Sequence, residues 1–445
     1  MPAGSTGMRP IRSYNRRMRR RFILSVLYTD VALLAIAFGL ATWWTLGSPF
    51  PWQIRLSPSA PSSIWPFATL LLTGLVIGSF LSARTAGVAV PRPSYGRAFA
   101  IAGIAAAFTA TAVAVTRVYH SNTVLVISLS TWLVMGLVHR AVRRRRPWTE
   151  RMVVVTAEKG LVDDLRAARH VDIVAVFDPT GEPPEAEFPG TSLVLDLREV
   201  LSDRMAQFVS SWNLAGYLVR TLTVVYEQHT GRLPMVHLAE GWELSDPVAA
   251  NDYAPYKRAV DLLFGLITAV VWVPLGIVLW VMVKLDSDGP AIYSQTRVGL
   301  NGKPFTLYKF RTMRLDAEPN GPRFAVPNDD RLTRAGRWLR RVRVDEIPQM
   351  WNVVKGDLSL VGPRPERPEF TAQFERTIPF YQYRHLVRPG VTGWAQVNHG
   401  YADGEAQTVE KLTYDLYYVK HMSPGLDVEI LGRSIWTVLS GFGAQ

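Results

Sequence analysis

Long apolar stretches alternate with basic segments in the first third of the chain. Four stretches have the composition of transmembrane helices: Phe22–Trp44, Ile64–Leu81, Ala98–Thr116 and Thr123–Val138. A helix needs about 20 residues to cross the hydrocarbon of a bilayer, and the fourth stretch is the shortest. The first stretch is too long for the core of a cleavable signal peptide, so we expect it to be retained. The pattern predicts an N-terminal four-helix transmembrane bundle.

The charges around these stretches predict their orientation. Basic runs precede the first stretch and follow the fourth, at Arg16–Arg21 and Arg143–Arg146. Cytoplasmic segments carry an excess of Lys and Arg, so both ends of this unit are expected on the cytoplasmic side.

Between Arg151 and Ala254 the composition changes to that of a soluble domain. Short apolar runs predict strands and one amphipathic run predicts a helix, in the order strand Met152–Val155, helix Leu161–Arg169, strand Val171–Phe177, strand Leu193–Asp196 and strand Tyr217–Val219. This alternation is typical of a small, parallel, Rossmann-like α/β domain. The first turn, Thr156–Gly160, lacks the closely spaced glycines that let a backbone approach a pyrophosphate. We therefore expect this domain to act as a scaffold, in dimerisation or in regulation.

A fifth apolar segment, Val260–Val283, is long enough to span a membrane but has basic residues at both ends. Pro274 lies in its middle, where a proline removes a helical hydrogen bond and favours a kink. Two interpretations are open. A kinked span would place the rest of the chain outside, whereas a re-entrant helix would return to the cytoplasmic side. The flanking charges favour the re-entrant helix.

The remainder, from Asp286 to Gln445, is unusually basic and predicts a mostly α-helical domain. Within it, Arg334–Val344 alternates arginines with apolar residues. Such a helix suits an anionic membrane surface, and it equally suits a solvated basic face.

Composition narrows the possible functions. The 445 residues carry a formal net charge of +12, and 48% of them are hydrophobic. A basic balance suits nucleic acids, anionic membranes or phosphate-rich substrates. The basic runs lie beside apolar spans and no nucleic-acid motif is present, so membranes and phosphates are favoured. The chain has no cysteine, which excludes disulfides, thiolate catalysis and zinc–thiolate sites.

Two adjacent acids, Asp345 and Glu346, follow a cluster of arginines that includes Arg340. Pro348 is tolerated in the first turn of a helix, so a helix is expected to begin near Asp345. Acids at a helix N-terminus are common caps. An ionised aspartate in this position is also able to bind Mg²⁺ or to attack phosphorus. On this stretch alone the capping role is favoured.

Three further motifs change that balance. The run Tyr308–Met313 places Lys309 and Arg311 on one face of an apparent strand. The segment Gly362–Pro365 fixes Arg364 between two prolines, which suits bidentate phosphate recognition. A third segment adds another arginine and amide groups, Arg388 through Gln396. Arginines, acids and Mg²⁺ are the usual components of phosphoryl-transfer sites.

Here the sequence resembles the bacterial sugar transferases, the monotopic phosphoglycosyl transferases. The resemblance covers roughly Tyr256–Gln445 and rests on many ordered matches: Lys257–Arg258 with Asp261, Thr296–Gly299, Tyr308–Met313, Asp345–Glu346 with Pro348–Gln349, Asn352 with Lys355–Asp357, Gly362–Pro365, Arg388–Asn398, and Asp415 with Tyr417–Tyr418. The preceding part resembles, by architecture, the large members that start exopolysaccharide, capsule or O-antigen synthesis.

The resemblance implies a reaction and the residues that carry it. Asp345 would attack a UDP-sugar, release UMP and pass the sugar phosphate to undecaprenyl phosphate. Mg²⁺ would lie near Asp345 and Glu346. Basic or polar positions near the phosphates or substrates would be Lys309, Arg311, Arg340, Arg364, Arg388 and Gln396. The membrane helix of the family is re-entrant and breaks at a Ser-Pro pair. Here the pair reads Val273–Pro274, so the proline is kept and the hydroxyl is missing.

These inferences together predict three domains, with limits 1–147, 148–254 and 255–445 and a re-entrant helix at 258–284. The predicted location is the bacterial inner membrane, with several spans and the catalytic domain on the cytoplasmic face. UDP-glucose is the expected donor, followed by UDP-galactose. A homodimer is compatible with the architecture, and no nucleic-acid partner is expected. The alternative is a non-catalytic membrane scaffold of a polysaccharide assembly system.

Overall fold

The computed structural model describes residues 12–50, 64–84, 95–116, 121–144, 149–185, 188, 190–215, 217–236, 253–314, 331–399 and 405–440. The chain folds as two compact units, Met1–Leu222 and Thr223–Gln445. This division falls within a helix rather than at the predicted limit near residue 254, and the three predicted domains stay a prediction. Arg145 and Arg146 of the predicted basic run lie outside the described residues.

Four apolar helices begin the first unit, in agreement with the four predicted stretches. They are α1 Arg12–Leu46, α2 Trp65–Arg84, α3 Tyr95–Thr116 and α4 Asn122–Arg144. Each contains a segment long and apolar enough to cross a membrane. One core of buried residues joins them, with Phe67, Ile101 and Trp132 at most 1% exposed. A buried ion pair of 3.2 Å between Arg140 and Asp30 connects α4 to α1.

The rest of the first unit contains the predicted parallel sheet. Its strands are β1 Glu150–Val155, β2 Val171–Phe177, β3 Ser192–Leu195 and β4 Val219–Thr221, and their order is β2-β1-β3-β4. All three pairings are parallel. Helices α5 Lys159–Ala167 and α6 Asp203–Leu214 connect strands. The sheet is buried because its apolar runs pack against Met205 and Trp212 of α6.

Helix α7 Leu222–Thr230 follows β4 directly and leads into the second unit. That unit then contains α9 Tyr253–Ile267, α10 Ala269–Asp286, β5 Ile292–Val298, β6 Pro304–Phe310, α11 Arg334–Arg341, α12 Gln349–Lys355, β7 Ser359–Val361, α13 Pro368–Thr377, β8 Gly390–Thr392, α14 Trp394–Asn398, α15 Glu405–His421 and α16 Pro424–Ser440. Short 3-10 helices, η4 Leu300–Gly302, η5 Val344–Glu346 and η6 Tyr381–Leu386, lie between them. Strands β5 and β6 form an antiparallel hairpin, while β7 and β8 pair in parallel.

The hairpin turn follows from its sequence. Asn301 and Gly302 both have a left-handed backbone, with φ of 54° and 73°. An Asn-Gly pair adopts such angles readily and favours a tight reversal between strands. The reversal returns β6 beside β5, so that Lys309 lies opposite Tyr293.

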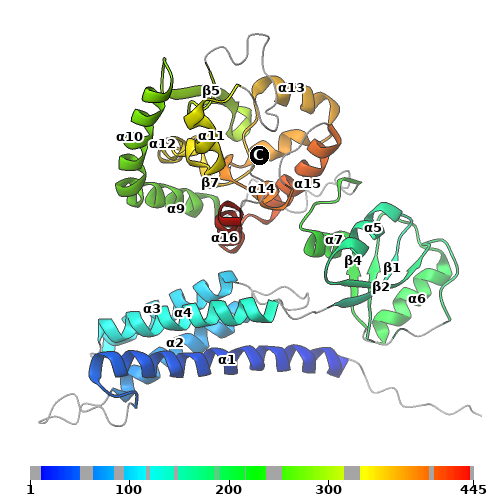
Figure 1. Ribbon diagram of the computed structural model, residues 1–445. Coiled ribbons are helices and arrows are strands. Elements are labelled where there is room, and N and C mark those ends of the chain that lie inside the picture. Colours follow the sequence, from blue (N-terminus) through cyan, green and yellow to red (C-terminus); the bar gives the residue numbers. More distant parts are fainter. Residues whose placement is uncertain are drawn as a thin grey trace, which may run out of the picture. The chain divides into compact units, whose positions relative to one another are not determined.

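Helices α9 and α10 meet at a corner along the outside of the second unit (Figure 1). Their outward side chains are apolar, and Leu263, Ile267, Val270 and Val278 are more than half exposed. The inner side of α9 is polar and anchored: Arg258 donates to the carbonyl oxygens of Val353 and Val354 at 2.6 and 2.9 Å. The outer face of α9 and α10 is therefore apolar, while the inner face of α9 is held to α12 by hydrogen bonds. Such an exposed apolar face suits contact with lipid.

The interruption between α9 and α10 lies at Thr268, not at Pro274, which corrects the predicted position of the break. Pro274 is inside α10. The physical reason is that side chains near Thr268 donate hydrogen bonds to the backbone carbonyl groups that a helix break leaves without a partner. At the corner, the Thr268 hydroxyl donates to the Phe264 carbonyl at 2.6 Å and the Trp272 indole donates to the Gly265 carbonyl at 2.9 Å. Val273 offers no such donor beside Pro274, so the chain bends where carbonyl groups find partners.

Candidate active site

The two predicted acids lie on the short 3-10 helix η5, just before α12. Helix α12 begins at Gln349 with Pro348 as its N-cap, so the acids precede the helix instead of forming its first turn. Arg343 has a left-handed backbone with φ 59°, which turns the chain out of the preceding α11 segment. This sharp reversal presents Asp345 and Glu346 to the end of β6.

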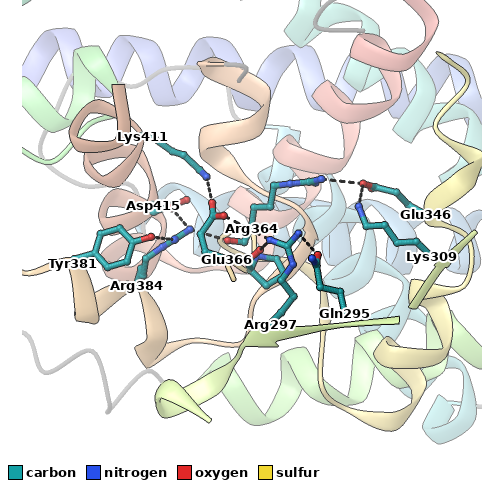
Figure 2. A network of polar contacts seen from close by, with 11 residues as sticks. Gln295, Arg297, Lys309, Glu346, Arg364, Glu366, Tyr381, Arg384, Lys411 and Asp415 are labelled. Atoms are coloured by element: carbon teal, nitrogen blue, oxygen red, sulfur yellow. Dashed lines mark hydrogen bonds and ion pairs between the residues drawn. The ribbon is translucent and has the colours of Figure 1, made fainter. Parts of the chain in front are cut away.

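Glu346 is held by two cations. Its Oε1 atom accepts from Lys309 Nζ at 2.9 Å and from Arg364 Nη2 at 3.2 Å (Figure 2). Burial alone would raise the pKa of Glu346, but the charges of Lys309 and Arg364 overcome it and hold that pKa far below its usual range. Glu346 is therefore ionised at every physiological pH and neutralises part of the cationic cluster.

Asp345 has the opposite environment. It is 8% exposed, and within the part of the chain that the structure describes no group donates a hydrogen bond to its carboxylate. Burial and the neighbouring charge of Glu346 raise the pKa of Asp345, while Lys309, Arg340 and Arg364 oppose the rise. A buried carboxylate without donors keeps its lone pairs available, which suits a nucleophile or a ligand of a cation.

Lys309 is the cation on β6 that reaches the acids. Burial lowers the pKa of Lys309, and the charge of Glu346 opposes this effect. Arg311, which was predicted to lie on the same strand face as Lys309, contacts Ser287 instead of the acids. Its Nη2 donates to the Ser287 carbonyl and hydroxyl, both at 2.8 Å. Two other nitrogens of Arg311, Nε and Nη1, are buried without a partner among the described residues.

The remaining predicted residues divide into two groups. Arg340 adds positive charge near Asp345 and donates to the Thr312 hydroxyl at 2.9 Å. Arg388 instead donates to the Gly356 carbonyl at 3.2 Å, and Gln396 donates weakly to the Val391 carbonyl at 3.4 Å. Neither contacts the two acids in the described residues. The structure thus brings Lys309, Arg340 and Arg364 to Asp345 and Glu346.

The loop that carries Arg364 is fixed by a buried ionic network that the sequence motifs did not assign (Figure 2). Arg384 Nη2 donates to the Arg364 carbonyl and to the Asp415 carboxylate, each at 2.8 Å. Arg297 Nη1 donates to the Pro365 carbonyl at 3.0 Å. These contacts hold the backbone that directly follows the Arg364 side chain, and its guanidinium is directed toward Glu346.

Glu366 is the acid at the centre of this network. It accepts from Lys411 and lies 3.7 Å from Arg297. Burial alone would raise the pKa of Glu366, but Lys411, Arg384 and Arg297 lower it to about 2. Arg297 and Asp415 lie in two of the sequence stretches that resemble the family. That resemblance was the signal in the sequence for this network.

The two acids also fit a magnesium ion. No group of three or more metal-ligating side chains occurs within the described ranges, but Mg²⁺ typically binds through one or two carboxylates together with substrate phosphates and water. Asp345, whose carboxylate accepts no hydrogen bond within the described part of the chain, has oxygens free to meet that requirement. With fewer than three such protein ligands, substrate phosphates and water would have to complete the shell of the ion.

Known proteins share the part of the chain that carries this site. Residues 252–441 match the family described as bacterial sugar transferase. The UDP-N-acetylgalactosamine-undecaprenyl-phosphate N-acetylgalactosaminephosphotransferase of Aeromonas hydrophila is 44% identical over 255 residues, which are 57% of this chain and 60% of that protein. The UDP-glucose:undecaprenyl-phosphate glucose-1-phosphate transferase of Escherichia coli is 40% identical over 190 residues, 42% of this chain and 40% of that protein.

A third relative is shorter. The exopolysaccharide production protein PSS of Rhizobium leguminosarum bv. phaseoli is 41% identical over 190 residues, which cover 41% of this chain and 95% of that protein. The chain thus spans 60% of the Aeromonas relative, 40% of the Escherichia relative and nearly all of the Rhizobium one. From the matched region and these identities, the chain belongs to the bacterial sugar transferase family.

Proposed function

We propose that this chain transfers a sugar 1-phosphate from a UDP-sugar to undecaprenyl phosphate, as the first step in the synthesis of an exopolysaccharide, capsule or O-antigen. The observation that carries the proposal is the buried Asp345 carboxylate, which has no hydrogen-bond donor among the described residues and lies among three cations. The names of the Aeromonas and Escherichia relatives describe the same type of transfer.

The proposed reaction has two steps. An oxygen of Asp345 attacks the sugar-bearing phosphorus of the donor, an Asp–phosphorus bond forms, and the bond to the UMP oxygen breaks. An oxygen of undecaprenyl phosphate then attacks the same phosphorus and Asp345 leaves as a carboxylate. Because UMP departs before the second anion enters, the two phosphate substrates do not repel each other in the site.

Protein charges would stabilise the transition state in both steps. Lys309 and Arg364 lie at the acids, where the phosphorus oxygens gather negative charge, and fixed donors in a dry site act strongly. Glu346 holds these two cations in place without competing for the phosphorus, because it stays ionised and paired. Mg²⁺ held at Asp345 and Glu346 would supply further neutralisation of the phosphates.

Apolar helices would bring the site to its lipid substrate. We propose that α1–α4 span the inner membrane, and that α9 and α10 enter from the cytoplasmic side and return at the Thr268 corner. The exposed apolar side chains of α9 and α10 support this placement. The catalytic unit would then lie on the cytoplasmic face, where nucleotide sugars are made.

The donor sugar is a finer proposal. UDP-glucose is the expected donor and UDP-galactose the next, while the name of the Aeromonas relative adds UDP-N-acetylgalactosamine to the set worth testing. The first experiment measures UMP release by purified full-length protein in detergent with undecaprenyl phosphate, Mg²⁺ and a panel of these UDP-sugars. Release with one sugar that depends on the lipid supports the reaction. Folded protein that releases UMP with none of them contradicts it and favours the scaffold alternative.

The covalent step has its own variant. Asp345→Asn removes the proposed nucleophile and should lower UMP release by at least about a thousandfold, since the adjacent acid, Glu346, is held in ion pairs by Lys309 and Arg364. Intact-mass analysis without acceptor should show one added sugar phosphate on the native chain and none on Asp345→Asn. Glu369→Gln, which changes an exposed acid on α13, is the matched control and should behave as the native chain. Ordinary turnover in Asp345→Asn would exclude Asp345 as the nucleophile.

A further inference from the structure

Residues 223–233, called the strap below, come from the chain ahead of the region that matches the family, yet they pack on the catalytic unit. Glu227, on α7, is 3% exposed. Its two carboxylate oxygens accept from Lys420 Nζ at 2.9 Å and from His421 Nε2 at 2.7 Å. An acid buried this deeply and paired on both oxygens marks a specific contact, because an unpaired charge there would be costly.

The strap follows one face of α15. Arg232 donates through Nε to the Tyr414 hydroxyl at 2.9 Å and pairs with Glu410 at 2.7 Å. The backbone N–H of Leu233 donates to the Thr413 carbonyl at 3.0 Å. The contacted positions of α15 are therefore 410, 413 and 414, followed seven residues further on by 420 and 421. Steps of three, four and seven residues lie on a single helix face.

The turn of the strap contacts the first residue of α14, Trp394. Trp394 Nε1 donates to the Gly231 carbonyl at 2.7 Å, and a Cβ atom on Gly231 would lie 2.9 Å from the Trp394 ring. Gly231 has φ +68°, a conformation suited to glycine. The Trp394 ring also stacks on Tyr417 and lies under the Arg433 guanidinium. Trp394 is thus fixed from three sides, and the strap provides one of them.

Trp394 is joined to Arg364 by close backbone contacts. Its neighbour Gly393 lies so near the Gly362 carbonyl that a Cβ atom would overlap it. The N–H of Gly362 donates to the Thr392 carbonyl at 2.8 Å, and that of Gly390 donates to the Pro363 carbonyl at 2.9 Å. A shift of Trp394 and the preceding residues Gly390–Gly393 would therefore move the segment that carries Arg364.

We infer that the strap is a positioning element of the active site, which sets the Arg364 guanidinium against Glu346 through Gly231 and Trp394. The inference rests on the proposed function for its catalytic consequence, while the mechanical link can be measured without activity. The strap lies outside residues 252–441, so this link joins a segment ahead of the family-matched region to the active site within that region.

Gly231→Ala in the full-length chain tests the link, because the new methyl group would push against the Trp394 ring. Gly302→Ala is the matched control: Gly302 has φ +73°, is in the same unit and has open space around it. UMP release is followed in a single turnover without acceptor, which gives an amplitude and a rate constant. We expect the rate constant of Gly231→Ala to fall about tenfold at unchanged amplitude, since small misplacements of catalytic groups have effects of this size or more. Gly302→Ala should keep the native rate constant.

A purely structural role would have a different signature. It would lower the amplitude, which counts folded protein, and leave the rate constant of the remaining molecules unchanged. That result, or equal effects in the two glycine variants, would overturn the inference. Glu227→Gln, which keeps the shape of the side chain and weakens its two ion pairs, should change the rate constant in the same direction and serves if Gly231→Ala does not fold.

Hydrogen–deuterium exchange separates this inference from the proposed function. Exchange in residues 359–364 should be faster in Gly231→Ala than in Gly302→Ala, whether or not any UDP-sugar is a substrate. If native protein releases no UMP but exchange differs in this way, the proposed function fails and the link stands. Identical exchange in the two variants would overturn the link, whatever the activity.

Discussion

Asp345 and Glu346 are adjacent in the sequence, but their surroundings shift their pKa values in opposite directions. Two direct ion pairs keep Glu346 charged, while Asp345 is buried beside that charge with no donor of its own in the described residues. Divergent environments for two neighbouring acids are a common way to divide roles between them. Here they separate a permanent counter-charge, Glu346, from the proposed nucleophile, Asp345.

The same logic gives a stability prediction for Glu366. Its pKa is lowered from 4.5 to about 2 in the folded protein. A carboxyl group whose pKa is lower in the folded than in the unfolded chain stabilises the fold at any pH above its unfolded pKa. For Glu366 this stabilisation is lost as the pH falls from about 4.5 toward 2. We expect a loss on the order of 3 kcal/mol in the free energy of unfolding over this interval.

Denaturant unfolding of the full-length chain at pH 5 and pH 3 would measure the effect, with Glu366→Gln as the comparison. The variant should be less stable at pH 5, because Lys411 and Arg384 lose a charged partner, and should lose less on acidification. Parallel changes in the two proteins would contradict the assignment of this proton to Glu366.

At the scale of elements, a glycine lets α11 pack closely against the end of β6, because glycine has no Cβ atom. Gly336 is buried where a Cβ atom would overlap the Thr312 carbonyl. The helix approaches the end of β6 at this point, and Arg340 reaches the Thr312 hydroxyl from the next turn. The close approach therefore connects helix packing to the cationic side of the site.

Two glycine-to-alanine substitutions should change the thermal midpoint of unfolding in opposite directions. Alanine favours a helix over glycine by up to about 1 kcal/mol, so Gly432→Ala on α16, with open space around it, should raise the thermal midpoint slightly. Gly336→Ala should instead cost about 2–4 kcal/mol, because backbone must move to admit the methyl group. Thermal unfolding of both variants in the same detergent would compare them. An increase in midpoint for Gly336→Ala would show that α11 is not packed as described.

The α9–α10 corner gives a prediction about topology. Trp272→Phe keeps the ring and removes the N–H that donates to Gly265, which should cost about 1–2 kcal/mol in an apolar setting. The corner should then straighten in part of the molecules and place the catalytic unit on the opposite side of the membrane. Trp280→Phe changes an exposed tryptophan of the same helix and is the control.

Because the chain has no cysteine, a single reporter suffices to measure the change. Ala372→Cys, on the exposed face of α13, can be labelled by an impermeant maleimide in sealed vesicles of known orientation. A labelled fraction that rises in Trp272→Phe and not in Trp280→Phe supports the role of the corner. Equal fractions would mean that Trp272 is dispensable for the bend.

Local patterns predicted local features well. Hydrophobic runs located the strands of the parallel sheet within a few residues. They also located α1–α4, although α1 begins ten residues before the predicted stretch and α4 ends six residues after it. The acid pair and Arg364 were recognisable from neighbouring residues. Contacts between distant parts of the sequence were not predictable in this way. Arg384 meets Arg364 across 20 residues and Trp394 meets Gly231 across 163, and no spacing rule connects them. The corner was misplaced because proline was weighed without the donors of Thr268 and Trp272.

At the scale of the whole molecule, the strap predicts where the chain can be shortened. A chain that starts at residue 223 keeps Glu227, Gly231 and Arg232, whereas one that starts at residue 252 loses them. The Rhizobium relative is matched over 95% of its length by 190 residues of this chain, so both truncations keep a region about as long as that relative. We expect the first truncation to transfer sugar phosphate at about the native rate and the second at least about tenfold more slowly. Single-turnover UMP release would compare them, and equal rates would argue against the strap.

The junction between β4 and α7 also bears on the evolutionary history of the chain. Strand β4 ends at Thr221 and α7 begins at Leu222, so no spacer separates the parallel sheet from the strap. Recombination that brought a different N-terminal part to this catalytic region would have exchanged Glu227 while leaving Lys420 and His421 in place. We therefore expect residues at these three positions to covary among homologues that share the α/β domain, and the two positions on α15 to drift freely in homologues without it.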